Sequence, residues 1–287
     1  MKKLTYILLA SCLLLASCES WLDEDPQYTL NTQIQFSTSE KARAALYGCY
    51  GYFALTSGGY GQNWQEVPVR YSGFGWAQTN GNTNDMCGWL QCDYTDDLLT
   101  NAWYVMYKVI NETNAFIANV ESTSLEDKDE MAAEARFLRA YAYYWILQNQ
   151  GPMILLGDEL LDTNEEPSYY KKTRNTYDEC VDYICKEFEA AAEGLPEEQP
   201  VDLIASPTSG AALALVARLR LQAASPLFNG GDAARKYFGN FTRCTDGVHY
   251  VSQVYDERKW ALAAAAAKKV IDLGRYQLYT VAASTDA

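Results

Sequence analysis

Apolar residues recur every three or four positions along much of this chain, which is the spacing of one face of an α-helix. In residues 177–195 the repeating residues are Tyr177, Val181, Ile184, Phe188, Ala191 and Leu195. Residues 98–120 carry a second stripe, made of Leu99, Trp103, Met106, Ile110, Ile117 and Val120. A third stripe, in residues 128–150, consists of Met131, Ala135, Leu138, Ala142 and Trp145. The pattern predicts an all-α protein.

Capping residues mark where several of these helices start and stop. Thr176–Glu179 and Ser37–Glu40 both have the spacing of a capping box. The second box is expected to open a helix that Gly51 and the Gly58-Gly59 pair end. Asp127 can cap a helix that runs to Gln150 and stops before a Gly-Pro pair.

Two further helices are expected nearer the C-terminus. Ser206, followed by a proline at the first helical position, predicts a helix whose stripe is Ala211, Leu215, Leu219 and either Gln222 or Ala223. The last helix carries Trp260, Ala264, Ala267 and Ile271. Gly274 closes it, and Tyr276 and Leu278 then favour the start of a strand.

The spacing of the helices indicates how they are arranged. The helices of residues 98–120 and 128–150 start about thirty residues apart, and so do those starting at 177 and 207. Each pair then forms two antiparallel helices with a short connector, close to the tetratricopeptide period. Alanine-rich faces allow close packing. Because the strict consensus is absent, we predict a divergent tetratricopeptide-like helical-pair scaffold, with an irregular helical bundle as the alternative.

The N-terminus has the pattern of an export signal. Lys2 and Lys3 precede an apolar run that ends in Leu15-Ala16-Ser17-Cys18, which resembles a bacterial lipoprotein signal. We expect a signal peptide at 1–17, lipid on Cys18, an acidic tether over 18–36 and a globular domain over 37–287. A second Leu-Ala-Ser-Cys ends at Cys12, but it leaves a very short apolar core.

Residues 56–97 are irregular and rich in glycine, and they combine aromatic rings with amides. A long loop without helical period is usually functional, and a sugar ring stacks on aromatic side chains while polar groups bind its hydroxyls. We therefore predict a ligand site made of Trp64, Tyr71, Trp76, Trp89, Asn80, Asn82, Asn84 and Asp85. The alternative is that these rings pin the loop onto the helices or face a partner. Residues 226–255 form a second irregular stretch, also rich in glycine and aromatics.

The charge balance narrows the class of ligand. The chain has 23 basic and 37 acidic residues, a net charge of −14 that becomes −16 once Lys2 and Lys3 are removed. Such a surface repels nucleic acid and anionic lipid, so a neutral sugar or peptide fits better. The 22 tyrosines and seven tryptophans suit such contacts, although many are expected to fill helix seams.

Neither a metal, a cofactor nor a catalytic motif stands out. Cys87 and Cys92 are the pair placed to form a disulfide, whereas Cys180 and Cys185 are poorly spaced for one. Zinc is disfavoured because the chain has a single histidine and no Cys-x-x-Cys, and a calcium site at Asp93, Asp96 and Asp97 stays an alternative. The paired carboxylates are expected to be solvated, so we predict a binding protein rather than an enzyme.

Five segments together resemble the SusD/RagB family of outer-membrane nutrient-binding lipoproteins. In order along the chain, they are Cys18 to Asp23 with Pro26; Trp103 with Tyr107 to Asn111 and Asn114; Glu134 to Tyr141, ending in Gly151-Pro152; Ala212 to Arg218 with Ser225 to Asn229; and Lys259-Trp260 with Ala264, Ala267 and Ile271. They span nearly the whole chain after the signal peptide.

The resemblance implies a function and a partner. Family members lie as a lid on a TonB-dependent transporter barrel at the cell surface and deliver an oligosaccharide or another nutrient to it. The alternative function is a helical-repeat scaffold lipoprotein that binds a protein or peptide. Members are usually far longer, so we expect an N-terminal portion without its C-terminal half and with an exposed apolar seam.

Overall fold

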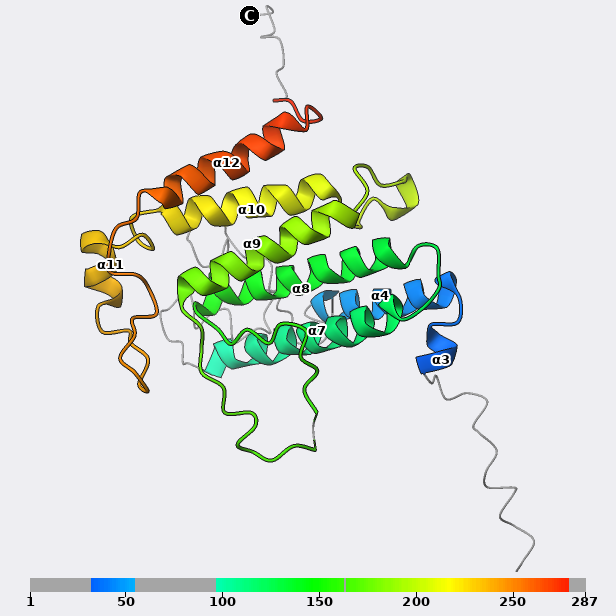
Figure 1. Ribbon diagram of the computed structural model, residues 1–287, viewed down its shortest axis with the longest axis horizontal. Helices are drawn as coiled ribbons and strands as arrows, with labels where there is room; N and C mark the ends of the chain where they lie inside the picture. Colours follow the sequence, from blue (N-terminus) through cyan, green and yellow to red (C-terminus); the bar gives the residue numbers. More distant parts are fainter. Residues whose placement is uncertain (1–31, 55–96, 163, 279–287) are drawn as a thin grey trace, which may run out of the picture.

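A computed structural model describes residues 32–54, 97–162 and 164–278, and over these ranges the chain is helical (Figure 1). Its elements are α3 Thr32–Gln35, α4 Ser39–Ala54, α7 Asp97–Glu121, α8 Lys128–Gln150, α9 Tyr177–Gly194, the 3₁₀ helix η2 Val201–Leu203, α10 Ser209–Ala224, α11 Gly231–Phe238 and α12 Arg258–Asp272. No strand occurs in the described part, which holds a single isolated bridge between Thr242 and His249. The predicted all-α class is confirmed.

The helices stack one after another in chain order. α7 packs on α8, α8 on α9, α9 on α10 and α10 on α12, while α4 lies against α7 and α8 (Figure 1). Successive helices of the stack run in opposite directions (Figure 1), and the connector between α7 and α8 is short, as predicted for that pair. Each helix therefore buries its apolar residues mainly against its neighbours in the stack, which is how repeat scaffolds are stabilised.

The core lies where α7, α8, α9 and α10 meet. All six residues of the 177–195 stripe are buried, as are all five of the 128–150 stripe, so both predictions are confirmed. Phe188 meets Phe137 of α8 edge-on, with ring centroids 5.3 Å apart. A second apolar cluster joins α4 to α7 and α8 through Leu46, Phe116 and Met131. Because α8 contributes to both clusters, it is buried on nearly all sides.

The predicted helix starts are correct in part. At α9 the capping box is present: Glu179 N donates to Thr176 Oγ1 at 3.3 Å and Thr176 N to Glu179 Oε2 at 2.7 Å. Asp127 precedes α8 but caps nothing, because its carboxylate instead accepts the Ser39 hydroxyl and pairs with Arg43. At α4 the cap is Thr38, not Ser37, and the helix runs to Ala54, past Gly51 and short of the Gly58-Gly59 pair.

At α10 the predicted start was two residues early. Thr208 is the cap and accepts from Ala211 N, while Ser206 closes the preceding turn through its own N–H to Leu203 O. The buried face runs through Ala212, Val216, Leu219 and Ala223 rather than Ala211 and Leu215. The shift arises because α10 is packed between α9 and α12 and presents contact surface to both.

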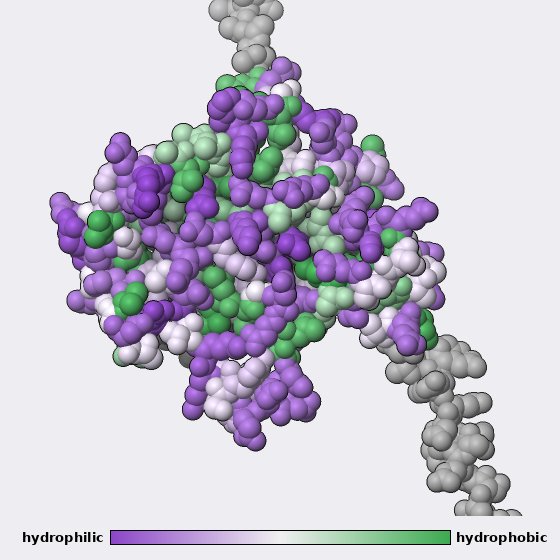
Figure 2. Space-filling model, in the orientation of Figure 1, coloured by the Kyte–Doolittle hydropathy of each residue, from purple (hydrophilic) through white to green (hydrophobic). Residues whose placement is uncertain are grey.

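The stripe predicted for α12 is not its packed face. Ala263 and Ala266 are buried, whereas Trp260 is 42% and Ile271 75% exposed, and Ala264 and Ala267 are exposed as well. Two small side chains let α12 approach α10 closely. Trp260, Leu262 and Ile271 are therefore exposed, and Figure 2 shows hydrophobic side chains at the surface over this helix.

The end of α12 and the state of two cysteines also test the sequence predictions. Gly274 ends α12 with φ +66°, as predicted, but residues 275–278 form no strand. Cys180 and Cys185 are buried free thiols, and burial raises the pKa of each to about 12. Among the described helices, none is long and apolar enough to cross a membrane.

Candidate functional site

The predicted ligand site lies outside the described residues. Trp64, Tyr71, Trp76, Trp89, Asn80, Asn82, Asn84 and Asp85 all fall in 55–96, as do Cys87 and Cys92. Cys18 falls in 1–31, and of the calcium candidates only the backbone of Asp97, the first residue of α7, is described. These assignments stay predictions.

An aromatic and cationic cluster lies at the start of α7, where the chain leaves the predicted ligand loop. The guanidinium of Arg174 lies over the Trp103 ring, 4.8 Å from its centroid. The rings of Trp103 and Tyr107 are 5.1 Å apart. A cation held over an indole stabilises both side chains, so the cluster fixes the segment around residue 174 against α7.

Tyrosine hydroxyls hold the extended residues 152–156 onto the helices. Tyr107 Oη donates to Ile154 O at 2.7 Å and accepts from Ile154 N at 3.0 Å. Leu156 N donates to Tyr143 Oη at 3.0 Å. Burial raises the pKa of both phenols, so they stay neutral near pH 7. This edge of the stack is thereby rigid.

Arg139 of α8 joins three helices and the loop that follows residue 156. Its side chain is 1% exposed, and its Nη1 donates to Asn114 Oδ1 and Asp158 Oδ1, each at 2.7 Å. Nε donates to Glu187 Oε2 at 3.1 Å. Burial alone would lower the pKa of Arg139, but the charge of Glu187, together with that of Tyr183 and the hydrogen bonds to Glu187 and Asp158, outweighs burial and raises the pKa. The group is a structural junction, because its donors are directed at protein acceptors.

The chain between this junction and α9 projects from the stack as a long loop (Figure 1). Within it, Glu159 accepts from the Tyr169 hydroxyl at 2.6 Å and from Lys172 Nζ at 2.8 Å. These bonds lower the pKa of Glu159. The loop is thus cross-linked at its base.

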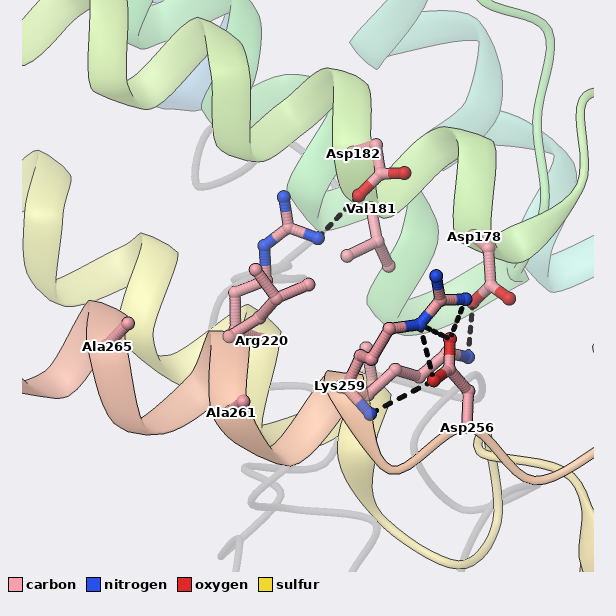
Figure 3. A pocket seen from close by; sticks show the side chains of 11 residues that line it. Asp178, Val181, Asp182, Arg220, Asp256, Lys259, Ala261 and Ala265 are labelled. Carbon is pink, nitrogen blue, oxygen red and sulfur yellow. Dashed lines mark hydrogen bonds and ion pairs between the residues drawn. The ribbon is translucent and has the colours of Figure 1, made fainter.

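A cleft of about 580 Å³ opens between α9, α10 and α12 (Figure 3). Its apolar wall is formed by Val181, Ala223, Ala261, Leu262 and Ala265. Its charged residues are three acids and three bases, namely Asp178, Asp182, Asp256, Arg220, Arg258 and Lys259. A volume of this size is typical of small-molecule sites.

The charged residues of the cleft form three ion pairs. Lys259 Nζ lies 2.6 Å from Asp178 Oδ1, and Arg258 Nη2 lies 2.8 Å from Asp256 Oδ2. Figure 3 shows Arg220 reaching from α10 toward Asp182 on α9, where its Nη1 pairs with the carboxylate. The local charge of the cleft is therefore balanced. In the described residues, the cleft included, no group of three or more potential ligands could hold a metal ion.

Comparison with known proteins identifies the family. A family model described as SusD-like, "starch-binding associating with outer membrane", matches residues 20–221. The chain belongs to this SusD-like family. The resemblance found in the sequence is thereby confirmed.

Similar proteins include members of the genus Bacteroides. A SusD-like protein of Bacteroides ovatus is 28% identical over 253 residues, which are 80% of this chain and 41% of the relative. A solved SusD homologue from Bacteroides thetaiotaomicron is 18% identical with a TM-score of 0.60, over 86% of this chain and 43% of that one. A solved protein in complex with a xylogluco-oligosaccharide is 24% identical with a TM-score of 0.53, over 84% of this chain and 41% of that one. The chain thus spans about two fifths of these relatives' length.

The segments that carried the resemblance have structural roles here. Asn229 is buried, and its Nδ2 donates to Asp256 O while Asp256 N donates to its Oδ1, both at 3.0 Å. Lys259 Nζ donates to Phe228 O at 3.1 Å, and the Phe228 ring stacks on Tyr177 at 4.4 Å. The Ser225 to Asn229 turn and the start of α12 are therefore locked together.

The residues that form the cleft, and those that surround Arg139, could not be recognised from the sequence as groups that lie together. Asp178 and Asp182 lie one helical turn apart on the polar side of α9, which was a usable signal. Arg220 lies on α10 and Lys259 on α12, and no spacing along the chain places those helices beside α9.

Proposed function

We propose that this SusD-like chain is a cell-surface lipoprotein that binds an oligosaccharide and delivers it to a TonB-dependent transporter. Membership of a family described as starch-binding and associated with the outer membrane carries the proposal. A structure of the same fold holds a xylogluco-oligosaccharide, which supports a glycan as the ligand. The acidic surface is consistent with a neutral ligand.

The proposed binding residues are those of the 56–97 loop, with Trp76 and Trp89 as stacking platforms. The described cluster of Trp103, Tyr107 and Arg174 supports this placement, because it rigidifies the helix into which that loop leads. A site held on a rigid element loses less conformational entropy on binding.

Tryptophan fluorescence tests the binding site. The chain from residue 18 onward, with Cys18→Ser to avoid lipidation, is titrated with maltotriose and xyloglucan oligosaccharides. Trp76→Ala and Trp89→Ala are compared with Trp260→Ala, an exposed tryptophan of α12. Loss of one stacking ring should weaken binding about fivefold or more, since truncating a buried aromatic contact at a binding site costs at least about 1 kcal/mol. Unchanged affinity in both loop variants would remove these residues from the site.

The membrane anchor and the partner need a separate test in cells. Palmitate labelling should mark the wild type and fail on Cys18→Ala, and an affinity-tagged wild type should copurify with a large barrel protein. Labelling that persists in the variant would contradict anchoring at Cys18. Turnover of a glycan by the purified chain would contradict the assignment as a binding protein.

A further inference from the structure

The size, the charges and the apolar wall of the cleft between α9, α10 and α12 all match one class of ligand. Its volume of about 580 Å³ fits one or two sugar rings or a molecule of that size. Its charged residues balance, with three acids facing three bases. One wall, made of Val181, Leu262 and the alanines of α12, is apolar.

Polar atoms in the cleft remain available to a ligand. Asp178 and Asp182 each use Oδ1 in an ion pair, and within the described residues nothing donates a hydrogen bond to either Oδ2. Arg220 is engaged through Nη1 alone, so its Nε and Nη2 have no acceptor in the described part of the chain. Acceptors and donors therefore lie side by side, and each is held in place by its ion pair.

This combination selects against charged ligands. An anion would meet the carboxylates of Asp178, Asp182 and Asp256, and a cation would meet Arg220, Arg258 and Lys259. Neighbouring hydroxyls, in contrast, can donate to a carboxylate and accept from a guanidinium, and such charge-assisted bonds are the stronger ones. The apolar wall suits the C–H face of a sugar ring.

We propose that this cleft is a second binding site for a neutral saccharide, with Asp178, Asp182 and Arg220 as its polar contacts and Leu262 and Ala265 as its apolar wall. Its lining residues are different from those of the loop of residues 56–97. The chain would then have two saccharide-binding sites, one in the loop of residues 56–97 and one in the cleft formed by α9, α10 and α12.

The test uses calorimetric titration of the chain from residue 18 onward, in a Trp76→Ala/Trp89→Ala background that removes the proposed loop site. The probes are maltotriose, a xyloglucan heptasaccharide, glycine as a zwitterion, inorganic phosphate as an anion and putrescine as a cation. We expect at least one saccharide to bind in this background and the three charged probes not to bind.

Two variants then locate that binding. Asp182→Ala removes an exposed carboxylate, and Ala265→Trp fills the cleft from an exposed position, so neither should prevent folding, which circular dichroism checks. Each should weaken saccharide binding at least tenfold. The matched control is Asp272→Asn on α12, which alters the exposed ion pair with Lys268 and should leave the saccharide affinity unchanged.

Two outcomes would overturn the proposal. One is that no saccharide binds in the double-variant background, which leaves the loop site and the proposed function standing. The other is equal affinity in Asp182→Ala, Ala265→Trp and Asp272→Asn. Binding of glycine, phosphate or putrescine in place of any saccharide would assign the cleft to another ligand class and would equally refute the proposal.

Discussion

Arg139 of α8 and Glu187 of α9 form an ion pair in the middle of the helix stack, with side chains 1% and 8% exposed. Asn114 and Asp158 bind the same guanidinium. A charge this deeply buried is tolerated only while its partners are present. The pair therefore ties the stability of three helices to one another.

Removing one member of this pair should destabilise the fold strongly. Glu187→Ala leaves the Arg139 charge buried without its main partner, and we expect a loss of about 3 to 5 kcal/mol in the free energy of unfolding. Urea denaturation followed by circular dichroism measures it. Asp272→Ala, which breaks an exposed pair with Lys268, should cost less than about 1 kcal/mol. Similar losses in the two variants would show that burial of the pair is unimportant.

The contact between the Ser225 to Asn229 turn and the start of α12 should depend on one buried amide, that of Asn229. Asn229→Ala removes the side chain that bonds both backbone groups of Asp256, leaving a partly buried N–H and C=O without that partner. We expect a loss of about 2 to 3 kcal/mol. Asn240→Ala, on an exposed residue, is the control, and thermal unfolding compares the two. Equal melting temperatures would contradict this role.

Residues 152–156 should open locally when their tyrosine support is removed. Tyr107→Phe keeps the ring but removes the hydroxyl that both donates to and accepts from Ile154. Hydrogen exchange at the amides of this segment should become faster, corresponding to about 1 to 2 kcal/mol of lost protection. Exchange in α12 should not change. Uniform acceleration across the chain would instead indicate global destabilisation.

The capping box of α9 gives the stability a dependence on pH. The backbone N–H of Thr176 is the main cause that holds the pKa of Glu179 below its usual value. A lowered folded-state pKa stabilises the protein above the unfolded value near 4.5, and this contribution disappears as pH falls through the folded pKa.

Glu179→Gln tests that dependence, because glutamine can still close a capping box but does not titrate. The wild type should be the more stable protein at pH 7, and the difference should shrink as the pH is lowered below about 4.5. Denaturation curves at pH 7, 5 and 3 measure it. A difference that grows on acidification would have the wrong sign and contradict the assignment.

The sequence was sufficient for features that depend on neighbours along the chain. The stripe from Tyr177 to Leu195 and the Thr176–Glu179 box were predicted correctly, because both follow from helix periodicity. In α12, alanines surround the helix on several sides, so the pattern could not tell the face on α10 from the face carrying Trp260.

Features that depend on contacts between distant residues were not predictable in this way. Glu187 lies 48 residues from Arg139 and Asn114 lies 25 residues from it, and only the stacking of α7, α8 and α9 brings them together. The cleft has the same origin, since its walls come from three helices. The eight loop residues of the proposed glycan site were chosen by composition, and they await the titrations described above.

Among the described helices, α12 has one principal neighbour, α10, whereas α9 and α10 each have two and α8 has three. In a one-dimensional array, a member that contacts a single neighbour separates from it at a lower free energy than an internal member. α12 should therefore fray first, and amide exchange there should report partial opening while α8 remains protected. Because α12 forms one wall of the cleft, a molecule bound in the cleft would also slow that fraying.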